Sequence, residues 1–216
     1  MGRLLAVCRV ARLHPDDSRV GVTAIDKQAV SGQVLVRDLG LRGDVQADRE
    51  DHGGPDQALY AYADEEASFW ARELGRDVPY GWFGENLRTA DVDVDGAVLG
   101  EHWQVGGSVL LEVTGPRIPC ATFARWVHEP RWVRRFAEHG RPGAYLRVLR
   151  KGVVSAGDEI SVTHRPSHGV TLERWFTRND PADANALVEY VRESGWVLPE
   201  NLRLPVLLAL RRAALG

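Results

Sequence analysis

The chain has 216 residues, of which 44% are apolar and 26% are charged, and its formal net charge is -3. These totals suit one globular domain, or one domain with a small appendage, and they give no support for binding to nucleic acid or to an acidic membrane surface. No apolar run approaches the roughly 20 residues that span a bilayer, so we expect no membrane association. The first residues do not resemble a signal peptide, and the two cysteines lack the spacing of a disulfide framework. We therefore expect a cytoplasmic location.

The first half of the chain is predicted to be rich in strands. Strands are expected over residues 4–10, 21–27, 32–37 and 58–63. Between the last two lies a long polar stretch, residues 39–56, which contains four glycines and has no amphipathic period. Long irregular loops of this kind are often functional, because glycine lets a backbone approach a ligand closely. A pair of ordinary turns between strands is the simpler alternative.

One helix is expected directly after the strand that ends at residue 63. Asp64 is expected to be its N-cap, and Gly75 is expected to end it. Apolar residues at helical spacing, among them Trp70 and Leu74, are expected to belong to the core.

Glu85 and Asn86 follow a glycine-bracketed aromatic pair at residues 81–84. Both side chains can form hydrogen bonds with the edge of a heteroaromatic ring. The alternative is a tight turn in which Asn86 bonds its own backbone, which is the commoner use of asparagine.

Cys120 follows two or three short strands expected within residues 97–114 and a turn that contains Pro116 and Pro119. Each proline fixes its own φ and biases the preceding residue towards extended geometry, so the turn should hold the cysteine stiffly. Arg117 is placed to favour the thiolate, which is the form that attacks electrophiles or binds metals. The alternative for Cys120 is a small apolar core residue, and we expect that role for Cys8 inside the first strand.

The last third of the chain changes from strands to helices. Residues 123–137 are expected to be helical or irregular, and the last strands are expected over residues 145–149, 153–154 and 159–162. Beyond residue 171 only helical signals remain, including Asp180 as an N-cap before Pro181 and a helix from Pro199 that Pro205 kinks or restarts. We therefore predict a mostly β body with α additions over residues 1–165 and a C-terminal three-helix domain over residues 166–216.

Several common catalytic motifs are missing. The chain has no HExxH, P-loop, GxGxxG or GxSxG sequence. What remains is one constrained cysteine, two glycine-rich loops and nearby basic residues. A thiolate is a soft ligand for a redox-active metal, or a nucleophile where a base is close, and the basic residues suit an anionic cofactor tail. For Lys27, a solvated surface position is an equal alternative.

Six segments in order resemble the MOSC domain family, which is named for the C-terminal part of molybdenum cofactor sulfurase. These segments are residues 40–48, 52–56, 83–87, 116–120, 143–149 and 152–158. No single segment is decisive, but the ordered set is specific and covers almost the full chain. The resemblance is greatest to the YiiM-like subgroup, whose members carry a C-terminal three-helix domain.

The resemblance implies a β-barrel body that holds the molybdenum cofactor, molybdopterin; pyridoxal phosphate binding is a further label attached to the family. It implies reduction of N-hydroxylated small molecules, such as amidoximes and N-hydroxylated purines. The N–O oxygen would pass to reduced molybdenum, and an external electron-donor protein would then reduce the metal again. The apolar run at residues 206–210 favours packing, and we expect a homodimer.

The resemblance also assigns roles to individual residues. Cys120 is the implied molybdenum ligand. The residues expected beside the metal are Gly43, Asp44, Gln46, His52 and Gly53, with Asp44 and His52 as further catalytic residues. The residues expected to hold the phosphate or the pterin are Lys27, Arg42, Arg117 and Arg147, and those expected to bond the pterin or the substrate are Glu85 and Asn86.

Three departures from the family pattern concern anion binding or substrate choice rather than the cysteine. Gln57 and Thr122 stand where lysine is frequent, and residues 24–27 read Ala-Ile-Asp-Lys in place of Gly-Ile-x-Lys. Two other functions remain open. One is a carrier that holds the cofactor or a persulfide on Cys120 without turnover, and the other is a metal-free thiol redox or sulfur-transfer enzyme.

Overall fold

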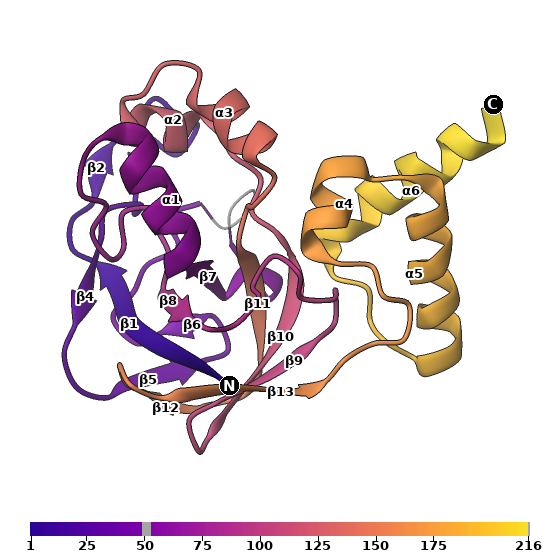
Figure 1. Cartoon of the computed structure of the whole chain (residues 1–216), viewed down its shortest axis with the longest axis horizontal. Helices are drawn as coiled ribbons and strands as arrows, with labels where there is room; N and C mark the ends of the chain where they lie inside the picture. Colours follow the sequence, from indigo (N-terminus) through magenta and orange to yellow (C-terminus); the bar gives the residue numbers. More distant parts are fainter. Residues whose placement is uncertain (49–52, 216) are drawn as a thin grey trace.

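Seven strands close into a barrel in the computed structural model, which describes residues 1–48 and 53–215. The strands of the ring are β1 (Gly2–Val10), β7 (Leu59–Ala63), β8 (Leu87–Ala90), β9 (His102–Val105), β10 (Val109–Pro116), β11 (Ala144–Arg150) and β13 (Glu159–His164). Their order is β13-β9-β10-β11-β7-β8-β1, and antiparallel pairing of β1 with β13 closes the ring. Only β7 and β8 pair in parallel among these described strands. The expected β-barrel is therefore confirmed (Figure 1).

Shorter strands extend the barrel. β4 (Lys27–Val30) pairs with β1, β2 (His14–Pro15) pairs with β3 (Val22–Thr23), and β5 (Val34–Arg37) lies between β6 (Gly40–Leu41) and β12 (Gly152–Val154). The strand expected over residues 21–27 is thus wrong in extent. The Thr23 hydroxyl accepts a hydrogen bond from the backbone N–H of Ile25, which takes this segment out of a strand ladder. A single 3₁₀ turn, Pro55–Gln57, precedes β7.

Three helices gather an aromatic cluster against the barrel. They are α1 (Asp64–Leu74), α2 (Ala121–Val127) and α3 (Trp132–His139). Trp70, Phe123 and Phe136 come from these three helices and belong to one buried cluster. Gly75 ends α1 in the left-handed conformation, as expected. Asp64 is not the N-cap, because β7 runs directly into the helix and Asp64 is its first helical residue.

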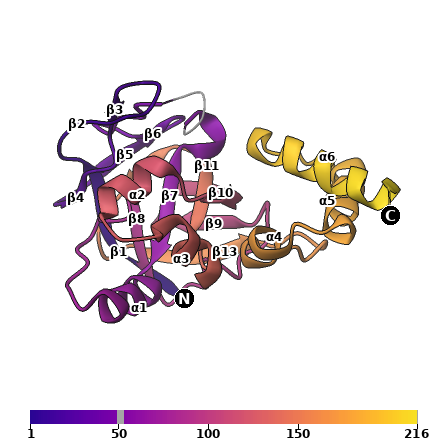
Figure 2. The same ribbon diagram turned by 90° about the horizontal axis from the view of Figure 1, so that it is seen from above.

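The C-terminal helices lie to one side of the barrel (Figures 1 and 2). They are α4 (Leu172–Arg178), α5 (Pro181–Ser194) and α6 (Glu200–Leu215), and α4 and α6 contact β10. The Asp180 carboxylate accepts from the N–H of Asp183 and caps α5, as expected. α6 begins one residue after Pro199 and continues through Pro205 without a restart. Its first turns share a hydrophobic cluster with the barrel, and the domain boundary at residue 165 stays a prediction.

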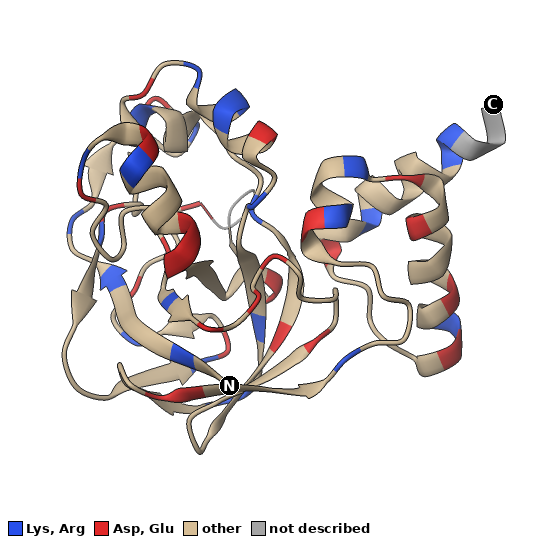
Figure 3. Ribbon diagram, in the orientation of Figure 1, with Lys and Arg blue, Asp and Glu red and all other residues tan. Residues whose placement is uncertain are grey.

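The described surface carries charges of both signs. Acidic and basic residues are interspersed along the barrel and the C-terminal helices in Figure 3. None of the helices in the described part of the chain combines the length and the apolar character needed to cross a membrane.

Candidate functional site

A pocket opens where the segment before β4, the loop after β6 and the turn after β10 meet. Its cavity volume is about 160 Å³. Six of the residues predicted from the sequence lie in its wall, and these are Lys27, Asp44, Gln46, Asn86, Arg117 and Cys120. The structure therefore brings together residues that are as much as 93 positions apart in the chain, from Lys27 to Cys120.

Cys120 stands between the end of β10 and the start of α2. It is the N-cap residue of α2, with an extended backbone, and its side chain is half-buried in the pocket wall. Cys8 is fully buried in β1, and this burial raises the pKa of its thiol to about 12. A thiol with so high a pKa is neither a nucleophile nor a ready metal ligand. The two cysteines thus have the contrasting environments that the sequence suggested.

Arg117 is a buried cation in the same wall, with only 6% of its surface exposed. Its Nη1 donates a hydrogen bond to the Phe83 carbonyl at 3.0 Å, and its guanidinium carbon lies 5.3 Å from the centre of the Tyr60 ring. No carboxylate in the described part of the chain forms an ion pair with it. Because a buried charge is costly when it is not neutralised, this guanidinium favours an anionic ligand in the pocket.

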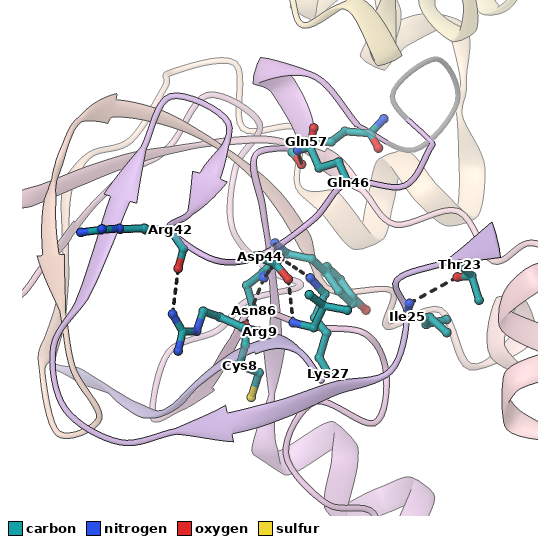
Figure 4. Close-up of polar contacts among 12 residues, drawn as sticks. Cys8, Arg9, Thr23, Ile25, Lys27, Arg42, Asp44, Gln46, Gln57 and Asn86 are labelled. Carbon is teal, nitrogen blue, oxygen red and sulfur yellow. Dashed lines mark hydrogen bonds and ion pairs between the residues drawn. The ribbon is translucent and has the colours of Figure 1, made fainter. Parts of the chain in front are cut away.

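Asp44 organises another part of the pocket wall, and Figure 4 shows its polar contacts. Its carboxylate forms an ion pair with Lys27 Nζ and accepts hydrogen bonds from Asn86 Nδ2 at 2.7 Å and from the Val10 N–H at 2.8 Å. Lys27 is therefore half-buried, with a side chain only 9% exposed, and it is paired, so the alternative of a solvated surface lysine is wrong. The three donors occupy most of the acceptor positions of Asp44, which suits a positioning role for this carboxylate.

Asn86 and Gln46 fix the pocket wall through their amides. Asn86 Oδ1 accepts from the Tyr60 N–H at 3.2 Å, and its Nδ2 also donates to the Cys8 carbonyl at 3.2 Å. Gln46 Nε2 donates to the Gln57 carbonyl at 3.1 Å, and its Oε1 accepts from the Gly54 N–H at 3.0 Å. Gln46 thus connects the middle of the glycine-rich stretch to the residues just before β7.

Two residues predicted from this loop are not part of the pocket wall that the structure describes. His52 lies outside the described residues. Gly53 is half-buried and lies beside Gly54, which adopts a positive φ of 86°. This geometry tests neither the catalytic role predicted for His52 nor the cofactor-binding role predicted for Gly53.

Glu85 lies outside the pocket, fully buried in the turn that precedes β8. Its carboxylate accepts hydrogen bonds from the N–H groups of Gly81 and Phe83, at 2.7 and 3.0 Å. Arg88 adds two more, at 2.9 and 2.5 Å. With four donors around it, this carboxylate holds the turn in place and has no capacity left for a pterin or a substrate.

Three other predicted residues are also kept away from the pocket. Arg42 is exposed and points away from Asp44 in Figure 4, and its carbonyl accepts from Arg9 Nη1 at 2.9 Å. Gly43 adopts a positive φ of 85° in the turn after β6 and is exposed. Arg147 forms ion pairs with Asp56 at 2.8 Å and with Glu112 at 3.6 Å, on the side of the barrel that faces the C-terminal helices.

Two of the three departures from the family pattern, Gln57 and Thr122, are single residues that line the pocket. The Thr122 hydroxyl donates to Asp16 Oδ2 at 2.8 Å, and Arg125 binds the same carboxylate through two nitrogens. These contacts hold the pKa of Asp16 well below its usual range. Gln57 has a buried Oε1 for which the described residues provide no hydrogen-bond partner.

Two tyrosines in the wall were missed by the sequence reasoning. Tyr60 and Tyr145 are paired across β7 and β11, with ring centres 5.5 Å apart. The Tyr60 hydroxyl donates to the Pro142 carbonyl at 2.8 Å. Burial raises the pKa of both phenols, so they stay neutral. Their sequence signal is weak, because tyrosine is an ordinary strand residue.

Comparisons with known proteins agree with this fold and pocket. The MOSC domain model matches residues 48–161. A protein named Reductase from Gibberella moniliformis is 34% identical over 147 residues, which are 67% of this chain and 26% of that protein. Protein YiiM from Escherichia coli is 32% identical over 148 residues, 67% of this chain and 66% of that one. The crystal structure of YiiM from Geobacillus stearothermophilus has a TM-score of 0.75 at 24% identity, covering 97% of this chain and all of the other.

Proposed function

This chain belongs to the MOSC domain family, and from that premise we propose that it is a molybdenum-cofactor-dependent reductase of N-hydroxylated compounds. MOSC domains are in general molybdenum-cofactor-binding domains. Similarity to a protein named Reductase and to YiiM supports an enzymatic role. The chain spans about a quarter of the Reductase, so the activity and partners of that whole protein are not transferred with the name.

The donor set of the pocket supports binding of this cofactor. Cys120 would supply a soft sulfur ligand to the metal, and Arg117 would bind the anionic part of the pterin. Among the described residues no three His, Cys, Asp or Glu side chains gather to hold a metal ion by themselves. When bound, the cofactor supplies two-electron redox chemistry at the metal.

The proposed reaction converts R–NH–OH, two electrons and two protons into R–NH₂ and water. The electrons come from an external donor protein, and the protons come from solvent. In this chain, Asp44 fixes the ammonium of Lys27 in the pocket wall, where the N–H groups not bonded to Asp44 can donate to a substrate oxygen. Tyr60 and Tyr145 remain protonated, so these two side chains add no charge to the pocket wall.

One observation carries the proposal. The half-buried thiol of Cys120 shares a pocket wall with Arg117, a buried cation that has no carboxylate partner among the described residues. This combination suits an anionic cofactor that ends in a metal with affinity for sulfur.

The test uses protein made in a host that produces the molybdenum cofactor. Molybdenum and pterin are measured in the purified protein, and reduction of benzamidoxime and of an N-hydroxylated purine is assayed with a chemical reductant. Wild type should turn over at least one of these substrates. Cys120→Ser should lose at least about 100-fold in rate, because a hydroxyl is a poor soft ligand, while Cys8→Ala serves as the matched control.

Three outcomes would contradict the proposal in different ways. Full activity of Cys120→Ser would remove the cysteine from the mechanism. Bound molybdenum and pterin without reduction of either substrate would favour a cofactor carrier. Protein that contains neither metal nor pterin, although the host makes both, would favour a metal-free thiol enzyme.

A further inference from the structure

A second cleft lies between the barrel and the C-terminal helices and adjoins the pocket of Cys120. Gln57 and Tyr145 line both hollows. The far wall of the second cleft comes from α4 and α6, through residues that include Trp175, Phe176 and Asn201. The cavity volume of this cleft is about 150 Å³.

The two hollows differ in their chemistry. The pocket of Cys120 is lined by charged residues, including Arg117 and Asp44, whereas no charged side chain in the described part of the chain lines the second cleft. The second cleft instead combines aromatic rings with three side-chain amides, those of Gln57, Asn179 and Asn201. Rings provide a stacking surface, and amides can both donate and accept hydrogen bonds at a ring edge. A charged phosphate finds no partner here.

Two of these amides have unmet hydrogen-bonding capacity. Gln57 Oε1 and Asn201 Oδ1 are buried, and the described residues offer neither of them a partner. A buried acceptor without a donor destabilises a protein unless a ligand or water supplies the donor. The amide torsion is soft, so a small rotation presents the oxygen to a ligand. Gly115 allows Asn201 to lie this close to β10, because an added Cβ there would be 2.5 Å from Asn201 Nδ2.

We propose that the second cleft binds the planar ring of the substrate, a neutral heteroaromatic compound with N–H donors, while its N–O group extends past Gln57 and Tyr145 towards Cys120. This inference rests on the proposed function. It makes the C-terminal helices part of the substrate site, with α4 contributing the stacking surface and α6 contributing the Asn201 acceptor.

The first test measures binding without turnover. Adenine, a neutral ring with N–H donors and the reduced form of an N-hydroxylated purine, is titrated into the protein by calorimetry. Asn201→Leu should weaken adenine binding by about tenfold, the size expected for a lost hydrogen bond to a buried group. Phe176→Leu should weaken it as well, through lost stacking. Asn185→Leu, an exposed position on α5, is the matched control.

Thermal unfolding separates binding from structure. Asn201→Leu should not lower the midpoint, because it replaces a buried acceptor without a partner by an apolar side chain of similar size. A lower midpoint together with unchanged adenine binding would show that Asn201 is structural, and it would overturn the inference. Unchanged binding in both Asn201→Leu and Phe176→Leu would overturn it as well.

The second test measures turnover and distinguishes the two proposals. The ratio of KM for an N-hydroxylated purine to KM for acetamidoxime, which has no ring, should rise in Asn201→Leu and stay at the wild-type value in Asn185→Leu. If acetamidoxime and the purine are both reduced but this ratio does not change, the cleft assignment is wrong and the proposed function stands. If neither compound is reduced while adenine binding depends on Asn201, the proposed function is wrong and the ring site stands.

Discussion

The guanidinium carbon of Arg117 lies 3.6 Å from the centre of the Phe123 ring. Phe123 is on α2, three residues after Cys120, so one short helix positions both the thiol and the ring on which the cation rests. The ring face is electron-rich and stabilises the buried charge in the absence of water. The cation and the sulfur are therefore held in a fixed relation to each other.

Arg117 should be needed for retention of the cofactor. We expect Arg117→Met to lower the pterin content of the purified protein by about tenfold or more, because a buried, charge-assisted hydrogen bond is lost. Arg117→Lys should show an intermediate loss, since lysine keeps the charge but not the planar stacking. Pterin fluorescence after oxidation measures the content, and Arg134→Met, on the exposed side of α3, is the control. Equal pterin content in all four proteins would refute this role.

The two cysteines should differ in reactivity. At pH 8, iodoacetamide should label Cys120 in native protein made without the cofactor and leave Cys8 unlabelled, because burial raises the pKa of the Cys8 thiol to about 12 and shields it. Peptide mass spectrometry gives the site of labelling. In denaturant both cysteines should react, and rapid labelling of native Cys8 would be the contrary result.

The ion pair between Lys27 and Asp44 should contribute to stability. Each side chain is only 9% exposed, so Lys27→Met leaves a buried carboxylate without its cation and should lower the free energy of unfolding by about 3 kcal/mol. Urea denaturation measures this change. The double variant Lys27→Met/Asp44→Leu should lose less unfolding free energy than the sum of the losses in the two single variants.

A matched exposed pair provides the control for that experiment. Lys151 and Asp38 lie 3.2 Å apart, with side chains 60% and 73% exposed. Because water screens exposed pairs, Lys151→Met should change the unfolding free energy by no more than about 0.5 kcal/mol. Equal effects of Lys27→Met and Lys151→Met would show that burial of the Lys27 pair has no energetic consequence.

Asp95 should make the protein less stable at neutral pH than at acidic pH. It is 1% exposed and accepts a hydrogen bond from the Gly143 N–H at 2.8 Å, and burial raises its pKa from 3.8 to about 7. Since its pKa is higher in the folded state, its contribution to the free energy of unfolding is fully present below pH 3.8. This contribution is lost as the pH rises through 7. The unfolding midpoint should therefore fall between pH 5 and pH 8.

Asp95→Asn isolates this contribution. The amide has no charge to desolvate, and its Oδ1 can still accept from Gly143. The decrease in midpoint between pH 5 and pH 8 should be smaller in the variant than in wild type. Identical pH profiles for the two proteins would mean that Asp95 does not titrate in this range.

The fold was predictable where short-range patterns decide the structure. Gly75 ends α1 and Asp180 caps α5 because their roles depend on neighbours within a few residues. The prediction of Asp64 as an N-cap was wrong because it also depends on the immediately neighbouring residues. Its expected role requires a break before the helix, and β7 instead continues directly into α1.

The site was predictable only in part, because polar residues change role with partners that are distant in the chain. Cys120 and Arg117 share one rigid turn, and both reach the pocket. Arg147 looked equally suitable, but Asp56, 91 positions earlier, holds it on another side of the barrel. Glu85 is taken up by the N–H groups of its own turn and by Arg88. The spacing of residues along the sequence does not show which side chains are already held by partners within the protein.

The closure of the ring by β1 and β13 affects how the protein is made. The edge of β1 that pairs with Ile160 and Glu159 has no final partner until that part of the chain has left the ribosome. During synthesis, Gly2 and Arg3 at the start of β1 therefore lack their partner on this edge, while Val7–Val10 can already pair with β4, and an unpaired strand edge is the kind of surface on which nascent chains associate. Molecular chaperones that cover the first residues should accordingly have their greatest effect on this protein before translation is complete.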